Sequence, residues 1–462
     1  MTITAALCAE NLTRQPRISV IIPVYNDQKN LAVCLQKLTQ STEPYECIVV
    51  DDGSTDNSAS VAREAGAKVI STVGRSGPAH ARNIGAAEAS SDLLLFLDAD
   101  VAVYPDSVSR VIAAFEQDLQ LDALMGSYDS DPEKSDFLSQ YRNLMHHFVH
   151  QNARRAASTF WTGFGAIRRA VFLRHDGFDA KFGKPSIEDI DLGYRLRANG
   201  CKIMLDPTLQ VKHLKEWSLP CMIRTDVTQR AIPWTELILK NASMPNDLNV
   251  RTSQRISVAL VFLLIALSIL ATLLNAKAFV PPAIALIFLL LSQYEIEITN
   301  GLRSKRMLGT GFFIATLVIT CFWSHQVWTL VCSLAAFLLL LFRNHCYRAG
   351  ASRYKLLDWT CILYFAGALL VVAIHFGGYP PAILFSALLG AVVLLDARFF
   401  AMLASKHGRL YATAAVPFQL LFHLNCGIGF LIGAARFLWS TKYRPTMPPT
   451  LAVSRRSDGT RI

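Results

Sequence analysis

Hydrophobic and polar positions follow two different patterns along the chain, and the change falls near residue 250. Before it, short apolar runs alternate with segments of helical spacing, and each run ends in polar residues. After about residue 255, long apolar runs dominate, several of them long enough to cross a bilayer core of about 30 Å at about 1.5 Å per residue. These patterns predict a soluble domain followed by a membrane domain.

The N-terminal half predicts alternating strands and helices. Apolar runs rich in β-branched residues predict buried strands, and the segments between them have helical spacing. The expected strands lie at 17–26, from 45 into an acidic turn ending near 58, at 67–72 and at 92–101; the expected helices lie at 30–38, at 58–66 and within 76–90. This alternation predicts an α/β fold with a parallel sheet and right-handed crossovers.

Composition supports a membrane protein. Hydrophobic residues make up 52% of the 462 residues and charged residues only 17%, which is too apolar for an ordinary soluble protein. The net charge of +10 fits cytoplasmic loops rich in Lys and Arg. No basic groove studded with aromatic residues indicates a nucleic-acid site, so no nucleic-acid partner is expected. The ten cysteines form no CxxC pair, and the N-terminus lacks the pattern of a signal peptide; both favour a catalytic part that faces the cytoplasm.

Polar side chains gather where the predicted strands end. Ligands of parallel sheets bind at these carboxyl ends. The residues there are Asn26, Asp51, Asp52, Asp98 and Asp100. Neither GxGxxG nor GxxxxGK[ST] is present, and carboxylates would repel a phosphate unless Mg²⁺ or Mn²⁺ lay between them. Each motif alone has a plainer explanation: DDGSTD as an Asx-rich turn, DAD as a common triplet, RNIGA as a helix face.

Seven stretches in order resemble family 2 glycosyltransferases of the GT-A fold. They are VIIPVYN, VVDDGSTDNS, GPAHARNIGA, FLDADV, WTGFGAIRR, GFDAKFG and EDIDLGYRL, and they cover about residues 17–215. The resemblance implies a Rossmann-like, mostly parallel sheet that binds a nucleotide-sugar donor. By the same resemblance, Tyr25 would stack on the base, Asp52 would hydrogen-bond it, and Arg82 would lie near the ribose or diphosphate. The full implied nucleotide set is Pro23, Tyr25, Asn26, Asp51, Asp52, Arg82 and Asp98.

The resemblance also implies a metal site and a catalytic base. Asp98 and Asp100 form the DxD motif, with Asp100 as the direct ligand of Mg²⁺ or Mn²⁺ and His213 completing the site, although a lone histidine is more often structural. An acceptor hydroxyl needs a positioned carboxylate to take its proton, and the matching group is Asp189, oriented by Glu188. One base without an enzyme nucleophile implies inversion at the anomeric carbon.

Other residues of these motifs have further expected roles. Trp161, Thr162 and Gly163 would bring backbone and an indole against the sugar or acceptor. An alternative explanation of SIED is a helix start, with Ser186 as the capping residue. Asp191 is expected to pair with Arg195 one turn later, as a structural contact.

The C-terminal half predicts a membrane domain of six to eight spans. Candidate spans lie at 256–275, 279–293, 309–324, 327–343, 358–376, 380–396 and 413–437. Basic residues gather in three loops, which we expect on the cytoplasmic side: Arg303, Lys305 and Arg306; Arg343, Arg348, Arg353 and Lys355; and Arg398, Lys406 and Arg409. PPAIALIFLLL at 281–291 resembles PPAILFSALLG at 380–390, which suggests a tandem repeat or a chance likeness of apolar runs.

The whole chain is therefore divided into five expected parts. They are an extension at 1–16, the GT-A domain at 17–215, interfacial amphipathic helices that contact membrane lipids at 216–250, the membrane domain at 251–440 and a basic tail at 441–462. Processive synthases that resemble this chain carry a QxxRW motif, and QRAIPW at 229–234 does not match it.

The expected function is inverting hexosyl transfer at the cytoplasmic face of an inner membrane. The donor would be a nucleotide-sugar, with a UDP-sugar ranked before a GDP-sugar by the resemblance, and the acceptor would be lipid-linked or an exported glycan. Two alternatives stay open: a processive polysaccharide synthase-translocase, and a non-catalytic transporter or scaffold with a degenerate transferase domain. The missing QxxRW motif counts against the first alternative, and the intact carboxylate motifs count against the second.

Overall fold

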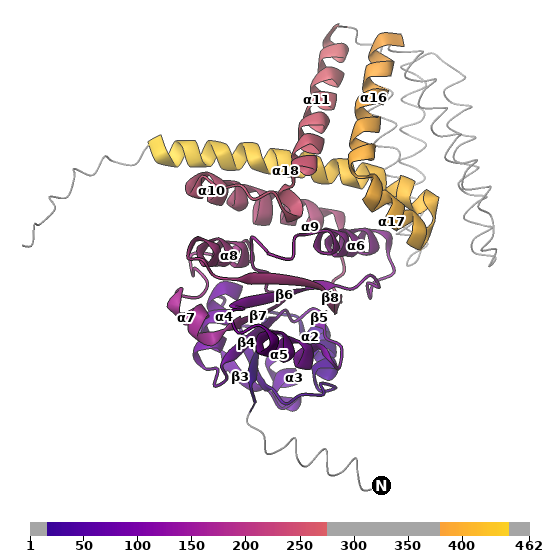
Figure 1. The fold of residues 1–462 in the computed structure, drawn as a ribbon. Coiled ribbons are helices and arrows are strands. Elements are labelled where there is room, and N and C mark those ends of the chain that lie inside the picture. The colour runs from indigo at the N-terminus through magenta and orange to yellow at the C-terminus, as the bar shows by residue number, and fades with distance from the viewer. Residues whose placement is uncertain (1–15, 275–378, 443–462) are drawn as a thin grey trace, which may run out of the picture.

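The computed structural model describes residues 16–274 and 379–442. An α/β domain forms one end of the molecule, and the C-terminal helices stand on one side of it (Figure 1). The strands are β1 (Ile18–Val24), β2 (Glu46–Asp51), β3 (Lys68–Ser71), β4 (Leu93–Leu97), β5 (Val101–Ala102), β6 (Ala123–Tyr128), β7 (Phe164–Arg168) and β8 (Ile203–His213).

Helices lie between these strands and beyond them. Those of the α/β domain are α2 (Gln28–Leu38), α3 (Ser58–Glu64), α4 (Pro78–Ala87), α5 (Ser107–Gln117), α6 (Phe137–Gln151), α7 (Arg169–Arg174) and α8 (Glu188–Ala198). Those that follow are α9 (Leu219–Arg224), the π-helix η1 (Thr225–Ala231), α10 (Ile232–Asn241), the 3₁₀-helix η2 (Leu248–Val250), α11 (Thr252–Leu274), α16 (Tyr379–Leu395), α17 (Ala397–His407) and α18 (Arg409–Lys442).

The eight strands form one mixed sheet in the order β3-β2-β1-β4-β7-β6-β8-β5. The four strands predicted from the sequence are parallel to one another, as expected. Beyond β4 the sheet changes, because β7 pairs antiparallel with both β4 and β6. The α/β fold with a Rossmann-like sheet is confirmed, and its antiparallel strand is a feature that periodicity did not reveal.

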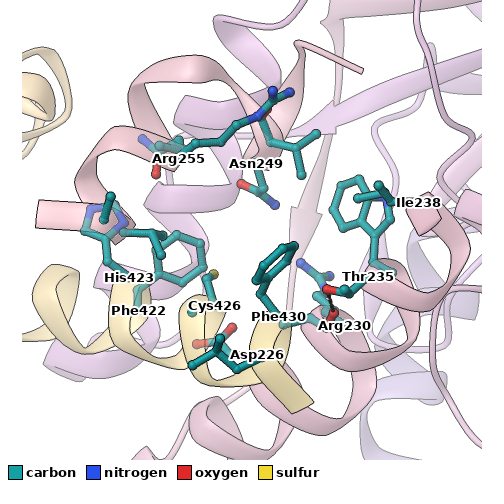
Figure 2. Close-up of a pocket in the computed structure, with 18 of the residues that line it drawn as sticks. Asp226, Arg230, Thr235, Ile238, Asn249, Arg255, Phe422, His423, Cys426 and Phe430 are labelled. Carbon is teal, nitrogen blue, oxygen red and sulfur yellow. Dashed lines mark hydrogen bonds between the residues drawn. The ribbon is translucent and has the colours of Figure 1, made fainter. Parts of the chain in front are cut away.

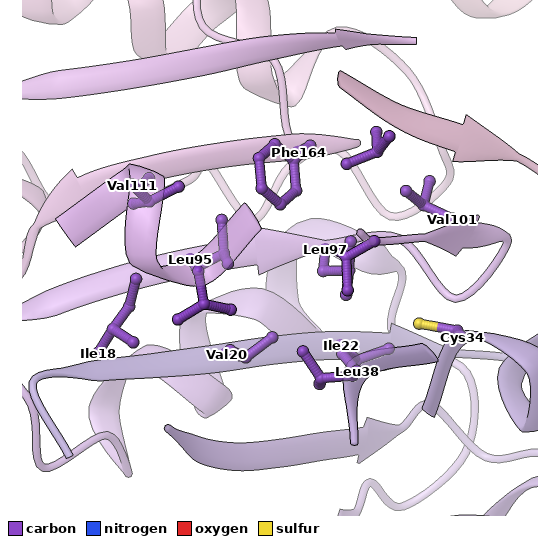
Figure 3. Close-up of a cluster of buried hydrophobic side chains, with 14 of the residues drawn as sticks. Ile18, Val20, Ile22, Cys34, Leu38, Leu95, Leu97, Val101, Val111 and Phe164 are labelled. Atoms are coloured by element: carbon purple, nitrogen blue, oxygen red, sulfur yellow. The ribbon is translucent and has the colours of Figure 1, made fainter. Parts of the chain in front are cut away.

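Side chains of the central strands alternate between two apolar layers. Ile18, Val20 and Ile22 of β1 point into the layer formed with α2 and α5, whereas Ile21 points into the opposite layer with α4 and α8 (Figure 3). This alternation follows from the period of two along a strand. Both faces are covered by helices, so the sheet edge at the carboxyl ends of β1 and β4 is where its polar groups reach solvent.

The helices after β8 pack onto the α/β domain through α6. Leu138, Tyr141 and Met145 of α6 share an apolar cluster with residues of α17 and α18. Arg142 of α6 forms a buried ion pair with Asp226 of η1, and Tyr141 donates a hydrogen bond to Gln419 of α18 at 2.8 Å. α6 therefore joins the sheet to the C-terminal helices.

Segment 216–250 is held inside the protein over much of its apolar face. Trp217, Met222, Ile232, Trp234 and Leu237 are all buried. α10 lies against α18 (Figure 1), and a Cβ at Gly433 would come within 2.7 Å of the Ile232 carbonyl oxygen, so the two helices approach closely. The interfacial position of this segment stays a prediction.

Three candidate spans fall on described helices. They are 256–275 in α11, 380–396 in α16 and 413–437 in α18; the spans at 279–293, 309–324, 327–343 and 358–376, most of the repeat, the basic loops at 303–306 and 343–355, and the terminal segments lie outside the described residues. By length and composition, the described chain has one helix able to cross a membrane, Arg409–Ser440, or two if the pair bent by 72° at Ala387–Leu395 and Ala397–His407 counts as one span. α11 and α16 run side by side, and α18 runs across their ends (Figure 1).

Candidate active site

A cavity of about 440 Å³ lies at the carboxyl ends of β1 and β4, and we call it the cleft. It collects residues from six of the seven stretches that the sequence singled out, and GFDAKFG at 177–183 contributes none. The predicted site residues in its wall are Pro23, Tyr25, Asp52, Arg82, Asp98, Asp100, Trp161, Thr162, Glu188, Asp189 and His213. Asn26, Asp51 and Gly163 lie beside the cleft rather than in its wall.

On the nucleotide side, two polar turns lie against each other. Asn26 adopts the left-handed conformation with φ 52° and accepts a hydrogen bond from the Thr55 backbone N–H at 2.7 Å. Asp51 accepts from the Ser54 N–H at 3.1 Å. These contacts show both side chains shaping the acidic turn, and their contact with a nucleotide stays a prediction.

Asp52 and Tyr25 stand closer to the opening. The buried Asp52 carboxylate accepts backbone hydrogen bonds from Ser76 at 2.8 Å and Gly77 at 2.7 Å, which hold the start of α4 against the cleft. The Tyr25 ring is 37% exposed, and the Arg75 guanidinium lies 4.0 Å from its centroid. An exposed ring at the cleft mouth is available for stacking.

Arg82 joins two motifs that are far apart in the sequence. Its buried guanidinium donates to Asp98 Oδ1 at 2.7 Å and to Glu188 Oε1 at 2.9 Å. The sequence placed Arg82 near the ribose or diphosphate, whereas the structure uses two of its nitrogens as a clamp between the DxD and ED motifs. Glu188 is thereby fixed one residue before the predicted base.

Asp189 is the half-buried carboxylate of the first turn of α8. It accepts a hydrogen bond from the Thr162 N–H at 3.3 Å. Burial raises the pKa of Asp189 to about 6, and the negative charge of Glu188 adds to the rise. Gly193 allows this placement, because a Cβ there would come within 2.3 Å of the Phe160 backbone nitrogen. A raised pKa in a cleft is typical of a general base.

The capping explanation of SIED is wrong. The residue before α8 is Ile187, and no side chain caps this helix end. Ser186 lies one residue earlier, and its hydroxyl donates to the Gln229 carbonyl at 3.2 Å. The expected pair of Asp191 and Arg195 is confirmed at 3.0 Å.

Asp100 and His213 face each other across the cleft floor, with 3.5 Å between Asp100 Oδ2 and His213 Nε2. The Trp217 indole N–H donates to Asn143 Oδ1 at 3.0 Å, which fixes that oxygen as an acceptor, so His213 Nδ1 donates to it at 2.7 Å. The Nε2 of a neutral His213 then points a lone pair at a carboxylate. Burial would raise the pKa of Asp100, but a protonated His213 lowers it to about 2 through its positive charge and its hydrogen bond.

This pair fits a divalent cation. A ligating histidine usually donates its other ring N–H to a fixed acceptor, as His213 does to Asn143. Among the residues that the structure describes, no group of three or more His, Cys, Asp or Glu side chains is arranged to hold a metal. Asp98, the third predicted ligand, is bound to Arg82 instead. A cation here would take Asp100 and His213, with further oxygens from the donor or water.

The WTGFGA segment at 161–166 forms part of the cleft wall beside Asp189. Trp161 and Thr162 line the cleft, and Thr162 holds Asp189. Gly163 supports the Trp161 ring, because a Cβ there would come within 2.4 Å of it. The roles of these three residues toward a sugar stay predictions.

Several residues of the cleft carried no motif in the sequence. Tyr128 stacks on His213 with 4.1 Å between ring centroids, and His146 lies next to Tyr128. Gln229, Arg230 and Trp234 also line the cleft, although QRAIPW had counted only as a mismatch. The π-helical turn of η1 shifts which side chains face the cleft, and a π-turn leaves no clear signal in composition.

Comparison with known proteins finds similarity over the N-terminal part of the chain. Residues 19–178 match the family model described as Glycosyl transferase family 2. An undecaprenyl-phosphate 4-deoxy-4-formamido-L-arabinose transferase from Serratia proteamaculans is 31% identical over 169 residues, 34% of this chain and 49% of that protein. A 4,4'-diaponeurosporenoate glycosyltransferase from Staphylococcus haemolyticus is 35% identical over 182 residues, 37% of this chain and 43% of that protein. The chain thus spans about half the length of the curated relatives it matches.

One solved structure is similar over nearly the full length of both chains. It is a mannosyltransferase from Pyrobaculum calidifontis in complex with GDP-Man and Mn²⁺, 16% identical, covering 95% of this chain and 97% of that chain with a TM-score of 0.42.

Proposed function

We propose that the protein is an inverting, metal-dependent glycosyltransferase, and the premise of this proposal is the match of residues 19–178 to glycosyl transferase family 2. The protein takes a sugar from a nucleotide-sugar donor, a UDP-sugar first, and transfers it to a hydroxyl of a lipid-linked acceptor at the cytoplasmic face of a membrane.

One observation carries this proposal: Asp189 and the Asp100–His213 pair line the same cleft. With a pKa of about 6, Asp189 is ionised at neutral pH and still basic enough to take a proton from an acceptor hydroxyl. Thr162 and the clamped Glu188 keep it in place. The other carboxylates that line the cleft are held by Asn30, by backbone N–H groups, by Arg82 or by His213; they are Asp27, Asp52, Asp98, Glu188 and Asp100. This favours Asp189 as the group for proton transfer and supports direct displacement with inversion.

Asp100 and His213 would hold Mg²⁺ or Mn²⁺, which when bound stabilises the charge of the departing nucleoside diphosphate. Asn143 keeps the His213 ring turned so that Nε2 faces Asp100. Tyr128 and Trp217 cover the ring and exclude water from that side. The protein thus supplies a fixed cation site on one side of the sugar and a base on the other.

A lipid-linked acceptor is supported by the apolar helices that adjoin the cleft. α18 contains a window apolar enough to cross a membrane, and it packs against α10, whose Trp234 lines the cleft. The Serratia relative carries undecaprenyl-phosphate in its name. We extend that chemistry to this chain as part of the proposal.

A screen of radiolabelled nucleotide sugars tests the function. Membranes that contain the full chain are incubated with each donor and Mn²⁺, and the organic-extractable product is analysed. We expect one donor to label a lipid product, and no labelling with the Asp100→Ala variant. Long polymer without added lipid acceptor would instead establish a processive synthase, and lack of any nucleotide-sugar binding would point to a non-catalytic protein.

A further inference from the structure

A second cavity, of about 380 Å³, adjoins the cleft on the side of the C-terminal helices, and we call it the apolar cavity. It lies between η1, α10, α11 and α18. Figure 2 shows Thr235 and Ile238 of α10 facing Cys426 and Phe430 of α18 across it, with Asn249 and Arg255 at one end. Its size falls within the range of about 300–1,000 Å³ that is usual for ligand sites.

The two cavities share three residues: Arg230, Trp234 and Asn249 line both. A molecule seated in the apolar cavity therefore reaches the cleft at Arg230. The positive charge of Arg230 acts to lower the pKa of Asp189, and the negative charge of Asp189 acts to raise the pKa of Arg230. The two groups are therefore close enough to interact electrostatically.

Charge at this junction is positive and incompletely paired. The charged side chains that line the apolar cavity are Arg142, Arg230, Arg255 and Asp226. Asp226 is paired with Arg142. Within the described residues, Arg230 has no carboxylate within 4.0 Å, and its nearest polar partner is His146 Nε2 at 3.4 Å. Burial lowers the pKa of His146 well below its usual value, so this ring is neutral and leaves the arginine charge uncompensated.

A second cation of the same wall, Arg142, is only partly satisfied by its partner Asp226. Arg142 is fully buried, and its Nε and Nη1 atoms have no hydrogen-bond partner among the described residues. Buried donors usually find an acceptor, so these two nitrogens leave positive charge behind the wall that the described residues do not fully satisfy, and this favours an anionic group nearby. Phosphate oxygens suit arginine especially well.

Resting on the proposed function, we propose that the apolar cavity holds the hydrocarbon chain of the acceptor and that Arg230 binds the phosphate joining that chain to a sugar. The sugar would then extend into the cleft and present its hydroxyl to Asp189. This layout names the acceptor class as a sugar linked through phosphate or diphosphate to a long hydrocarbon. The phosphate is a handle and not the nucleophile, which is why the site also needs a base.

The test compares acceptors on the purified full chain with labelled donor and Mn²⁺. The acceptors are a sugar diphosphate of a long polyprenol, the same sugar diphosphate of geraniol, and a phosphate-free alkyl glycoside. The variants are Ala259→Trp, which fills the apolar cavity, and Arg230→Gln. Matched controls are Ala266→Trp, two turns further along α11, and Arg224→Gln on the exposed end of α9.

We expect Ala259→Trp to raise KM for the long-chain acceptor by about tenfold or more relative to the geranyl acceptor, because several buried methylenes are lost. Arg230→Gln should weaken the phosphate-bearing acceptors about tenfold more than the alkyl glycoside. The two control variants should behave as the parent protein.

Three other results would overturn the proposal in distinguishable ways. If Ala259→Trp affected the long-chain and geranyl acceptors equally, the hydrocarbon chain would not bind in the apolar cavity. If Arg230→Gln affected the phosphate-bearing acceptors and the alkyl glycoside equally, Arg230 would not bind the phosphate. Efficient transfer to a bare polyprenyl phosphate that survives Asp189→Asn would make the phosphate the nucleophile. If the parent protein binds no nucleotide sugar, the proposed function itself has failed.

Discussion

The cleft and the apolar cavity meet at Arg230, Trp234 and Asn249, but they are built from different kinds of structure. Strand ends and short turns supply most of the cleft, and its polar groups are fixed by hydrogen bonds. Helices far apart in the sequence supply the cavity, and its wall is mostly apolar. A site at strand ends can be predicted from short sequence motifs. The shape of a cavity between helices depends on how the helices cross, which short motifs do not specify.

This difference can be tested by changing one region at a time. Substitutions in the cleft should alter turnover with every acceptor, and substitutions in the cavity should alter the affinity for particular acceptors.

The largest effect is expected from Asp189→Asn. The amide keeps the size and the hydrogen bond to Thr162 but cannot take a proton. Turnover on a hydroxyl acceptor should fall by about 10²–10⁴-fold while donor affinity is kept. Donor binding, thermal stability and turnover are measured on one preparation. Asp191→Asn on the same helix is the control, because its partner Arg195 lies outside the cleft. Near-normal turnover of Asp189→Asn would erase the base assignment.

The next effect concerns the cation. Removal of metal with EDTA should abolish transfer, and Mn²⁺ should restore it. Asn143→Leu should raise the Mn²⁺ concentration needed for half-maximal activity by about 10–100-fold, because His213 loses the partner that orients it. Asn152→Leu, beyond the far end of α6, is the matched control. Full activity in chelator would show that Asp100 and His213 do not serve a metal.

A smaller effect is expected in the pH profile. Because Asp189 must be ionised to act, kcat/KM should fall as the pH drops through about 6. Glu188→Gln removes a neighbouring negative charge, which makes the ionised form of Asp189 easier to reach. The acid limb of the profile should therefore move to lower pH in that variant. A limb that stays in place, or moves upward, would contradict the assigned cause of the raised pKa.

The smallest effect belongs to the rim of the apolar cavity. Arg255 is exposed and donates to the carbonyls of Val250 and Pro245. Exposed charges contribute about 0–1 kcal/mol, so Arg255→Gln should raise KM for a lipid diphosphate sugar by no more than about fivefold. If Arg255→Gln raised KM as much as Arg230→Gln does, the phosphate would bind at Arg255 on the rim and not at Arg230.

Periodicity and turn chemistry predicted much of the first domain. The apolar run rich in β-branched residues from Ile18 to Val24 predicted a buried strand, and Asp98 and Asp100 followed a strand as expected. Antiparallel β7 was hidden, because a fully buried strand shows no direction in its composition. The pairing of Arg82 with Glu188 was also hidden, since no local pattern connects positions 106 residues apart.

The helical half was harder to predict for a physical reason. Apolar runs report that a helix is buried but not what buries it. The run predicted to span at 413–437 lies in α18, the described helix that is long and apolar enough to cross a membrane, but its direction across the ends of α11 and α16 was not predicted (Figure 1). Its polar residues Gln419, His423 and Asn425 are buried and bonded to Tyr141, Asp396 and Asp226. These partners lie on α6, on η1 and in the turn between α16 and α17, so only the fold reveals them.

The clamp at Arg82 changes what the motifs would mean in a lineage that has lost catalysis. Removing Glu188 would leave the buried Arg82 guanidinium with one carboxylate partner, Asp98, in place of two and would destabilise the fold, so selection for folding alone would retain both residues. Asp100, His213 and Asp189 lie outside the clamp and would be free to drift once transfer no longer matters. In related sequences, retention of Arg82 and Glu188 would therefore show only that the domain still has to fold. Retention of Asp100, His213 and Asp189 would instead show that the protein still catalyses transfer.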